Sequence, residues 1–393
     1  MPTENFSIAI VGGGIGGMAA ANALHVRGLD VQVYEQAPEL GEVGAGVLIT
    51  PNSLRLLDRI GVGDVVAAAG GRVGEGSQYY REDGTKVAPI LTVDSNGWNG
   101  MYGLHRADLL DALVSAFPRD RIHAGHRAVG FSQDADGARL SFENGAEVTA
   151  DAVIGADGIH SFLRNEITEP SPPIDSGSVA YRGLVPADRV PWWPKGISQL
   201  WMGERKHFLV YPVRRGELIN YVGFVPSKTN AAESWTAAGD PDKLRAEFAH
   251  WDPVVPRLLA EVEATNWWGL YDRDPLHKWT VGRLTLLGDA AHPMLPHLGQ
   301  GANQAIEDAL ALSVFVSRAS GESLPNALRA YEDLRRTRTT EVQLGARENG
   351  RRYDSEFDDL SVRDAEIAAS VKFRSWLYDY DAESAANEAL AVG

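Results

Sequence analysis

Apolar and polar residues follow two different rhythms within the first 35 residues of the chain. Residues 6–11, FSIAIV, form a short apolar run that is typical of a buried strand. Residues 15–28 change to helical spacing, and Gly28 stands where such a helix would end. Residues 31–35, VQVYE, return to strand alternation. This order predicts a βαβ unit with two parallel strands.

The rhythm changes again in the middle of the chain. Two segments, DAVIGADG at 151–158 and RLTLLGDAAHP at 283–293, each predict a buried strand that ends in a glycine-containing turn. Between them, residues 176–280 hold β-branched and aromatic segments separated by turns, which predicts an antiparallel sheet. From about residue 301 the spacing is helical. The pattern predicts an α/β fold with an inserted antiparallel sheet and C-terminal helices.

A glycine-rich turn joins the first predicted strand to the first helix. Gly12, Gly14 and Gly17 form G-x-G-x-x-G, whose glycines permit a tight turn, close backbone approach to a pyrophosphate and close helix packing. The helix N-terminus adds free N–H groups and a positive dipole end. Glu35 ends the second strand, where an acid accepts hydrogen bonds from a ribose. The motif predicts a bound dinucleotide and leaves open which one.

Two aspartates lie beside glycines at the ends of later predicted strands. Asp157 precedes Gly158, and Asp289 follows Gly288. Such a position puts a carboxylate at the carboxyl edge of the sheet, where a doubly wound fold binds its ligand. The helix starting near Gly301 could present its positive end to a flavin ring. The structural alternative for each aspartate is a turn or helix cap.

These three segments together resemble the class A FAD-dependent aromatic hydroxylases, flavoprotein monooxygenases of the para-hydroxybenzoate hydroxylase-like class. The resemblance runs from Ile8 to about Asp381 and is strongest toward salicylate hydroxylase, 3-hydroxybenzoate 6-hydroxylase and 6-hydroxynicotinate 3-monooxygenase. Further matching segments are GEVGAGVLITPN (41–52), LHRADLLDAL (104–113), AYRG (180–183), WWGLYDRDP (267–275) and WLYDYD (376–381).

The resemblance implies a domain plan and a set of cofactor contacts. A Rossmann-like FAD-binding domain would comprise residues 1–75, 104–175 and 281–360, a substrate-binding β-sheet domain residues 76–103 and 176–280, and a C-terminal helical segment residues 361–393. FAD would be held by Gly12, Gly14, Gly17, Glu35, Gly46, Arg106, Asp157, Asp289, Gly301 and Ala302.

The resemblance also implies the reaction. NADH or NADPH binds transiently and reduces the flavin, and O2 then adds to give a C4a-hydroperoxide that must be shielded from water. The favoured substrate is a small hydroxyaromatic acid such as salicylate or a hydroxybenzoate, in the breakdown of aromatic compounds. NADH is the favoured donor because the most similar enzymes use it. Loss of the phenol proton to a base makes the ring more nucleophilic.

Two histidines are candidates for that base. His207 and Tyr211 are four residues apart on a predicted strand and so share one face, as in a similar H-x-x-x-Y of the 3-hydroxybenzoate enzymes. Histidine titrates near pH ~6.5, which suits removal of a phenol proton. His297 follows Pro296 as in the salicylate and 6-hydroxynicotinate enzymes. The structural alternative for His207 and Tyr211 is ordinary packing on the sheet.

Arginines of the predicted substrate sheet are candidates for binding a carboxylate. Arg182 and Arg214 are such candidates, and Pro296 is expected to lie beside the substrate ring. The structural alternative for each arginine is a solvated surface position. Trp267 and Trp268 are adjacent on a strand, so at most one of them faces the substrate.

Composition narrows the functional classes. A net charge of −16 and a pI near 5.1 argue against binding to nucleic acid or anionic lipid. The absence of cysteine excludes thiolate metal sites and the disulfide reductases that share the FAD fingerprint, leaving O2 as the electron acceptor. No metal site is predicted. No apolar run is long enough for a membrane span, which predicts a cytoplasmic protein, monomeric or homodimeric.

Three alternatives stay open. Within the same fold, the chain could hydroxylate a hydroxypyridine carboxylate or another heterocycle, or act as an epoxidase. The 6-hydroxynicotinate enzymes carry a histidine where this chain has Leu48, which weakens the hydroxypyridine assignment. Outside the family, an NAD-dependent dehydrogenase would use the first βαβ unit but would leave the Gly-Asp segment near residue 289 unexplained.

Overall fold

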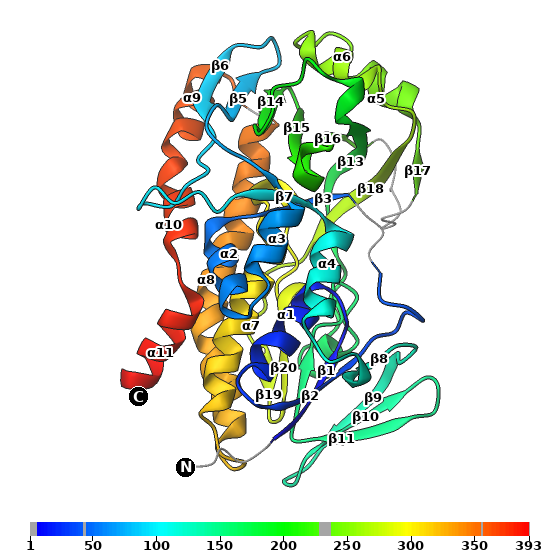
Figure 1. The fold of residues 1–393 in the computed structure, drawn as a ribbon, viewed down its shortest axis with the longest axis vertical. Helices are drawn as coiled ribbons and strands as arrows, with labels where there is room; N and C mark the ends of the chain where they lie inside the picture. Colours follow the sequence, from blue (N-terminus) through cyan, green and yellow to red (C-terminus); the bar gives the residue numbers. More distant parts are fainter. Residues whose placement is uncertain (1–5, 42–44, 228–236, 355–356, 393) are drawn as a thin grey trace.

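The computed structural model describes residues 6–41, 45–227, 237–354 and 357–392, so part of GEVGAGVLITPN (residues 42–44) lies outside the described residues. The lower half of the molecule in Figure 1 is built on a six-stranded sheet. Its order is β19 (Thr280–Val281), β20 (Leu284–Leu286), β12 (Ala152–Gly155), β1 (Ser7–Val11), β2 (Asp30–Tyr34) and β8 (Ile122–His123). All neighbours pair in parallel except β19 and β20. The predicted βαβ unit is confirmed, because α1 (Ile15–His25) joins the parallel pair β1 and β2.

Helices surround this sheet because its strands are apolar on both faces. Helix α1 packs against α7 (Gly301–Ser317), and both are almost wholly buried. The long helix α8 (Leu324–Tyr353) runs along both halves of the molecule in Figure 1. The remaining helices beside this sheet are α2 (Pro51–Arg59), α3 (Gly63–Ala69), α4 (Arg106–Ser115) and α11 (Ala382–Val392), whereas α9 (Leu360–Ala369) lies in the upper half and α10 (Val371–Asp379) connects α9 to α11. In the described part of the chain, no helix has the length and apolar character needed to cross a membrane.

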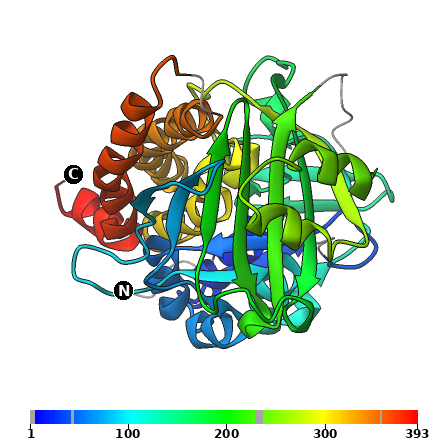
Figure 2. The same ribbon diagram turned by 90° about the horizontal axis from the view of Figure 1, so that it is seen from above.

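The upper half holds an eight-stranded sheet. Its order is β17 (Ala238–Gly239), β18 (Thr265–Asp272), β13 (Ile174–Pro186), β16 (Leu218–Pro226), β15 (Lys206–Val213), β14 (Gln199–Gly203), β5 (Gln78–Arg81) and β6 (Lys86–Pro89). All pairs are antiparallel except β14 with β5, so the predicted antiparallel sheet over 176–280 is confirmed and extended by two earlier strands. Helices α5 (Pro241–Glu247) and α6 (Val254–Leu259) cover one face, as Figure 2 shows.

The alternation of side chains along these strands decides which residues face the other half of the molecule. Phe208 and Trp267 belong to the apolar cluster under α5 and α6. Tyr211 and Trp268 belong to a different cluster on the opposite face. The two adjacent tryptophans therefore lie on opposite faces of the sheet, as their adjacency on a strand predicts, and Trp268 lies on the face turned away from α5 and α6.

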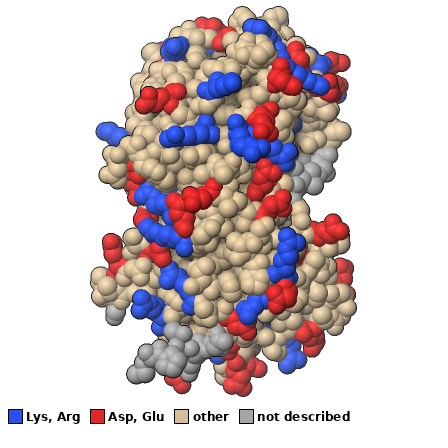
Figure 3. Space-filling model, viewed as in Figure 1, with Lys and Arg blue, Asp and Glu red and all other residues tan. Residues whose placement is uncertain are grey.

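Two small sheets and several short turns complete the fold. The sheets are β9 (Ala128–Gln133), β10 (Ala138–Phe142) and β11 (Glu147–Ala150), and β3 (Gly46–Ile49), β7 (Tyr102–His105) and β4 (Gly71–Arg72). The 3₁₀ turns are η1 (Arg119–Arg121), η2 (Leu163–Glu166), η3 (Ala187–Arg189), η4 (Arg214–Gly216), η5 (Gly288–Ala290) and η6 (Pro296–Leu298). Basic and acidic side chains are interspersed over the face in Figure 3, so the net negative charge is spread rather than gathered.

Candidate active site

A cavity of about 380 Å³ is lined by residues of both halves. The parallel-sheet half contributes the start of α1 and the loop between β20 and α7. The antiparallel sheet contributes side chains of β13, β15, β16 and β18. Part of the wall is backbone at Gly14, Gly288 and Gly301, and part is aromatic at Phe224 and Trp268. Such a wall suits a long ligand that is polar in one portion and aromatic in another.

The three motif positions require glycine for different physical reasons. A Cβ on Gly17 would lie 1.9 Å from the carbonyl oxygen of Gly12, and one on Gly12 would lie 2.2 Å from that of Ala156. Gly12 also has a φ of +112°, which side chains rarely tolerate. A Cβ on Gly14, in contrast, meets nothing within 4 Å, and Gly14 lines the cavity. Gly12 and Gly17 thus allow tight packing, while Gly14 leaves room for a ligand at the N-terminus of α1.

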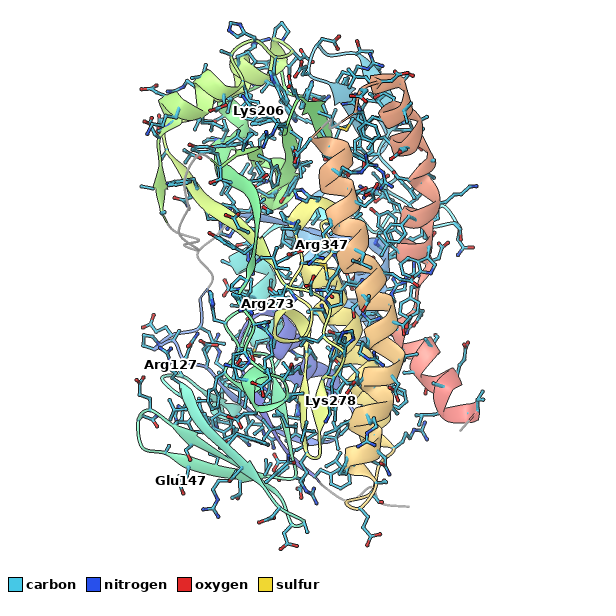
Figure 4. All side chains as sticks on the ribbon, turned by 180° about the vertical axis from the view of Figure 1, so that it is seen from behind. Arg127, Glu147, Lys206, Arg273, Lys278 and Arg347 are labelled. Atoms are coloured by element: carbon cyan, nitrogen blue, oxygen red, sulfur yellow. The ribbon has the colours of Figure 1, made fainter. Side chains whose placement is uncertain are left out.

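Glu35 closes the turn beside this helix start. Its carboxylate accepts hydrogen bonds from the backbone N–H of Gly13 at 2.6 Å and of Ala37 at 2.8 Å. A groove beyond it is lined by Gln36, Ala37, Gly125, Arg127, Glu143 and Asn144. Figure 4 labels Arg127 at the edge of the small sheet formed by β9 to β11. The room next to Glu35 therefore continues away from the main cavity.

Most of the other predicted cofactor residues lie on the cavity wall. These are Gly46, Arg106, Asp289, Gly301 and Ala302. Asp157 does not line the cavity. Its carboxylate accepts hydrogen bonds from Ser161 Oγ at 2.6 Å and from Leu163 N–H at 3.2 Å, and burial raises its pKa. Asp157 therefore stabilises the turn after β12.

Arg164 was not predicted, although it ends the segment GADGIHSFLR. Its guanidinium is buried and donates to the carbonyl oxygens of Ala290 and Asp289, both at 2.7 Å, and of Ile159 at 2.9 Å. Burial lowers the pKa of Arg164 to about 10, so it stays charged at neutral pH. Arg164 thus ties the two aspartate-containing turns together. A lone arginine after a turn gives no signal for this in the sequence.

Arg182 and Tyr211 face the aromatic part of the cavity. The buried guanidinium of Arg182 lies 4.3 Å from the ring centre of Trp268, and both residues line the cavity. Burial raises the pKa of Tyr211, so its phenol keeps its proton at neutral pH. Arg182 and Arg106 are the charges that oppose this rise. Pro296 also lines the cavity.

Arg214 lies elsewhere. Its half-exposed guanidinium forms two hydrogen bonds of 2.9 Å with the carboxylate of Asp108, and Arg214 is not among the residues that line the cavity. The structure separates the two candidate arginines. Arg182 lies on β13 and shares the face of Ala180, which points toward the cavity side, whereas Arg214 lies in the turn η4 after the end of β15.

The two candidate histidines lie next to each other, one side chain behind the cavity wall. Their ring centres are 5.0 Å apart, and neither residue is among those that line the cavity. The ring of Phe224, which lines the cavity, stacks on His207 at 4.0 Å. His207 Nδ1 lies 2.7 Å from a carboxylate oxygen of Asp354. His207 Nε2 and His297 Nδ1 are both buried, and neither has a hydrogen-bond partner in the part of the chain that the structure describes.

Burial and neighbouring groups set the charge states of His297 and Asp354. Burial, and then the neighbouring His207, lowers the pKa of His297 to about 3, so His297 is neutral at pH 7. His207 lowers the pKa of Asp354 against the effect of burial, so Asp354 is ionised. Tyr353, the residue before Asp354, has its ring centre 5.3 Å from that of His207. We call His207, His297, Tyr353 and Asp354 the histidine cluster.

A second buried polar group lies between α2, α7 and α8. Arg335 donates to Glu307 at 2.6 Å and to Asp308 at 2.7 Å, and Arg338 donates to Glu307 at 2.8 Å. Asn52 donates to Glu307 at 2.6 Å. We call Asn52, Glu307, Asp308, Arg335 and Arg338 the ionic network. Asp308 also accepts hydrogen bonds from Gly288 N–H and His292 Nε2, so the network fixes the turn that carries Asp289, and His292 has a structural role in it.

Comparison with known proteins agrees with this geometry. The family model described as "FAD binding domain" matches residues 5–344. A 3-amino-4-hydroxybenzoate 2-monooxygenase of Streptomyces platensis is 37% identical over 390 residues, covering 97% of this chain and 97% of the relative. A salicylate hydroxylase of Pseudomonas putida is 34% identical over 411 residues, covering 98% and 94%. A solved salicylate hydroxylase substrate complex has a TM-score of 0.85 at 28% identity, covering 98% of each chain.

Proposed function

The chain belongs to the FAD binding domain family and is an FAD-dependent monooxygenase, and we propose that it hydroxylates a small benzoate that carries a ring hydroxyl. The observation that carries this proposal is the shared cavity, in which a glycine-rich helix start and a buried Arg182 beside Tyr211 belong to one continuous lining. The relatives named for amino-hydroxybenzoate and salicylate support the same substrate class.

The residues around the glycine turn fit FAD. We propose that the N-terminus of α1 at Gly14 holds the pyrophosphate, that Glu35 binds the ribose, and that the groove at Gln36 and Arg127 takes the adenine. Arg106 and Asp289, with the start of α7 at Gly301 and Ala302 and the strand start at Gly46, would surround the flavin portion. FAD reduced by NAD(P)H supplies the activation of O2 for transfer of one oxygen atom to the ring.

The antiparallel sheet would hold the substrate. Arg182 is buried on the cavity wall, where a carboxylate gains a charge-assisted hydrogen bond in a site of low dielectric. Tyr211, which remains protonated, would donate a hydrogen bond to the substrate. Phe224, Trp268 and Pro296 give the aromatic ring an apolar wall that excludes water.

We propose that the histidine cluster receives the proton of the ring hydroxyl. His207 is the histidine that has a carboxylate at 2.7 Å, whereas in the described chain no carboxylate lies within hydrogen-bonding distance of His297. Removing the hydroxyl proton raises the electron density of the ring, which the oxygen transfer requires.

The proposed division into domains separates the cofactor contacts from the substrate contacts. We propose that residues 1–75, 104–175 and 281–360 carry the cofactor contacts, that residues 76–103 and 176–280 carry the substrate contacts, and that residues 361–393 form a helical segment beside them. The two earlier strands β5 and β6 support the second grouping because they extend the eight-stranded sheet.

A panel of purified substrates tests the proposal. The holoenzyme would be given NADH, O2 and one compound at a time: salicylate, 3-hydroxybenzoate, 3-amino-4-hydroxybenzoate, 6-hydroxynicotinate, or benzoate without a hydroxyl group. Coupled formation of hydroxylated product from a hydroxybenzoate supports the proposal. NADH oxidation without any hydroxylated product across the panel would overturn it. Arg182→Met should raise KM for the acid, while Arg214→Met, which changes an arginine in the turn η4 outside the cavity, should not.

A further inference from the structure

The two histidines of the cluster are both buried, and their surroundings differ in one respect. His207 is 1% exposed and His297 is 9% exposed. A buried imidazole gains a positive charge at a high desolvation cost unless a negative charge lies beside it. Asp354 provides that charge to His207 at 2.7 Å. His297 instead faces the second imidazole, whose own positive charge would oppose protonation.

Asp354 also determines which nitrogen of His207 carries hydrogen. An ionised carboxylate only accepts hydrogen bonds, so the Nδ1 atom that faces Asp354 must be the donor. Neutral imidazole has one N–H and one bare nitrogen, and Nε2 is then the bare nitrogen. This nitrogen is buried and has no hydrogen-bond partner among the described residues. Its lone pair is thus kept available for a proton.

Asp354 directly follows Tyr353, the last residue of α8, at the place where the cluster meets the surface. Its side chain is 17% exposed, whereas that of His207 is 1% exposed. The turn before β15 contacts the same place, because the backbone N–H of Arg205 donates a hydrogen bond to the carbonyl oxygen of Asp354. A proton shared between His207 Nδ1 and Asp354 is therefore one group away from solvent.

We propose that Asp354 is a positioning residue that makes His207, rather than His297, the proton acceptor for the substrate hydroxyl and that connects this acceptor to the surface. The inference rests on the proposed function. Because His207 does not line the cavity, the proton travels through a bridging water: the O–H bond of the substrate breaks, its electron pair stays on oxygen, the water accepts this proton and passes one on, and an N–H bond forms at Nε2 of His207. The Nδ1 proton then passes through Asp354 to water, so no oxidant or reductant is needed.

Other titratable groups surround this pair. His207 is faced by Asp354 and Tyr353 from α8 and by His297 from η6. Asp354 is also influenced by Arg205 from the turn between β14 and β15. Of these neighbours, Asp354 alone is an anion at neutral pH, so its removal takes away the negative charge that stabilises a protonated His207.

The test compares Asp354→Asn, Asp354→Glu and the control Glu366→Gln in the holoenzyme. Glu366 lies on α9, and its partly exposed carboxylate pairs with Arg351 and Arg352 near the end of α8. The wild-type enzyme is first assayed with the best hydroxybenzoate of the panel, which tests the proposed function by itself. Hydroxylated product, NADH consumption and FAD content are then measured for each variant from pH 6 to pH 9.

We expect Asp354→Asn to lower coupled turnover about tenfold at pH 7 and to recover as the pH rises toward about 10, where a phenol loses its proton without help. Asp354→Glu should retain most of the activity, and Glu366→Gln should match the wild type. Wild-type turnover in Asp354→Asn, or a loss that is the same at every pH, would overturn the proposal.

A second measurement depends neither on the Asp354 variants nor on the substrate. The ring nitrogens of His207 in ¹⁵N-labelled wild-type protein can be assigned by comparison with His207→Gln. A protonated Nδ1 supports the proposal. A neutral ring with its hydrogen on Nε2 would contradict it, even if every Asp354 variant failed to fold.

Discussion

Helix α8 contributes to two buried polar groups that differ in how their acceptor atoms are paired. In the ionic network, every carboxylate oxygen of Glu307 and Asp308 accepts at least one hydrogen bond, and two guanidinium groups balance two carboxylates, although Nη1 of Arg338 has no partner among the described residues. In the histidine cluster, neither His207 Nε2 nor His297 Nδ1 has a partner among the described residues. Fully paired carboxylates are typical of a structural element, whereas two unpaired imidazole nitrogens leave a position at which a proton can bind.

The difference shows how one helix can support both stability and chemistry. Arg335 and Arg338 lie toward the middle of α8, where they hold α7 and the turn at Gly288 and Asp289 that borders the cavity. Asp354 directly follows the same helix and lies beside His207. Paired charges hold the turn at Gly288 and Asp289, whereas His207 Nε2 at the other end of the helix has no partner among the described residues.

The largest effect is expected from Arg335→Ala. This change leaves Glu307 and Asp308 buried with too little positive charge, which costs about 3–5 kcal/mol of unfolding free energy. Urea unfolding and FAD content should both show the loss. The control Arg329→Ala removes an exposed arginine of the same helix and should change stability by less than about 0.5 kcal/mol. A loss below about 1 kcal/mol for Arg335→Ala would contradict a structural role of the network.

His207→Gln should separate function from stability. Loss of a general base typically lowers turnover about 100-fold, so we expect that decrease in coupled hydroxylation at pH 7. The unfolding free energy should fall by less than it does in Arg335→Ala. His250→Gln changes an exposed histidine and serves as the control. Normal hydroxylation with reduced stability in His207→Gln would reverse the assignment of the two groups.

The pH dependence of stability should reveal His297. Its pKa in the folded protein, about 3, lies below its ordinary value of 6.5 because of burial, so the unfolded chain binds the proton first. The contribution of neutral His297 to the free energy of unfolding is therefore present above pH ~6.5 and is lost as the pH falls toward 3. Over this range the free energy of unfolding falls by about 1.4 kcal/mol per pH unit. His297→Gln should flatten this slope in urea unfolding between pH 8 and pH 5. An unchanged slope would show that His297 is not a buried neutral histidine.

The smallest effect is expected from Asn52→Ala. It removes one hydrogen bond to Glu307, which keeps Arg335 and Arg338 as partners. The expected loss is about 1 kcal/mol of unfolding free energy, because the carboxylate remains paired. Urea unfolding measures this loss. The control is Asn326→Ala, which changes an exposed residue in the first turn of α8. A loss as large as that of Arg335→Ala would mean that the amide, rather than the arginines, satisfies the network.

Local signals in the sequence were sufficient for the cofactor half of the fold. The strand, the glycine turn and the helix over residues 6–28 lie next to each other in the chain, and their geometry depends on short-range sterics that glycine spacing reveals. Strand alternation likewise separated Trp267 from Trp268 without a structure. The resemblance added the cofactor and the reaction class.

The sequence by itself therefore determined the fold class, the FAD fingerprint and the general chemistry of this protein. Only the tertiary structure decided which polar residues meet. His207 and Asp354 are 147 residues apart, and nothing local marks them as partners. Arg182 and Arg214 were equivalent candidates until packing buried one beside Trp268 and paired the other with Asp108. The physical reason is that burial and counter-charge, which set the reactivity of a side chain, are supplied by distant segments that only folding brings together.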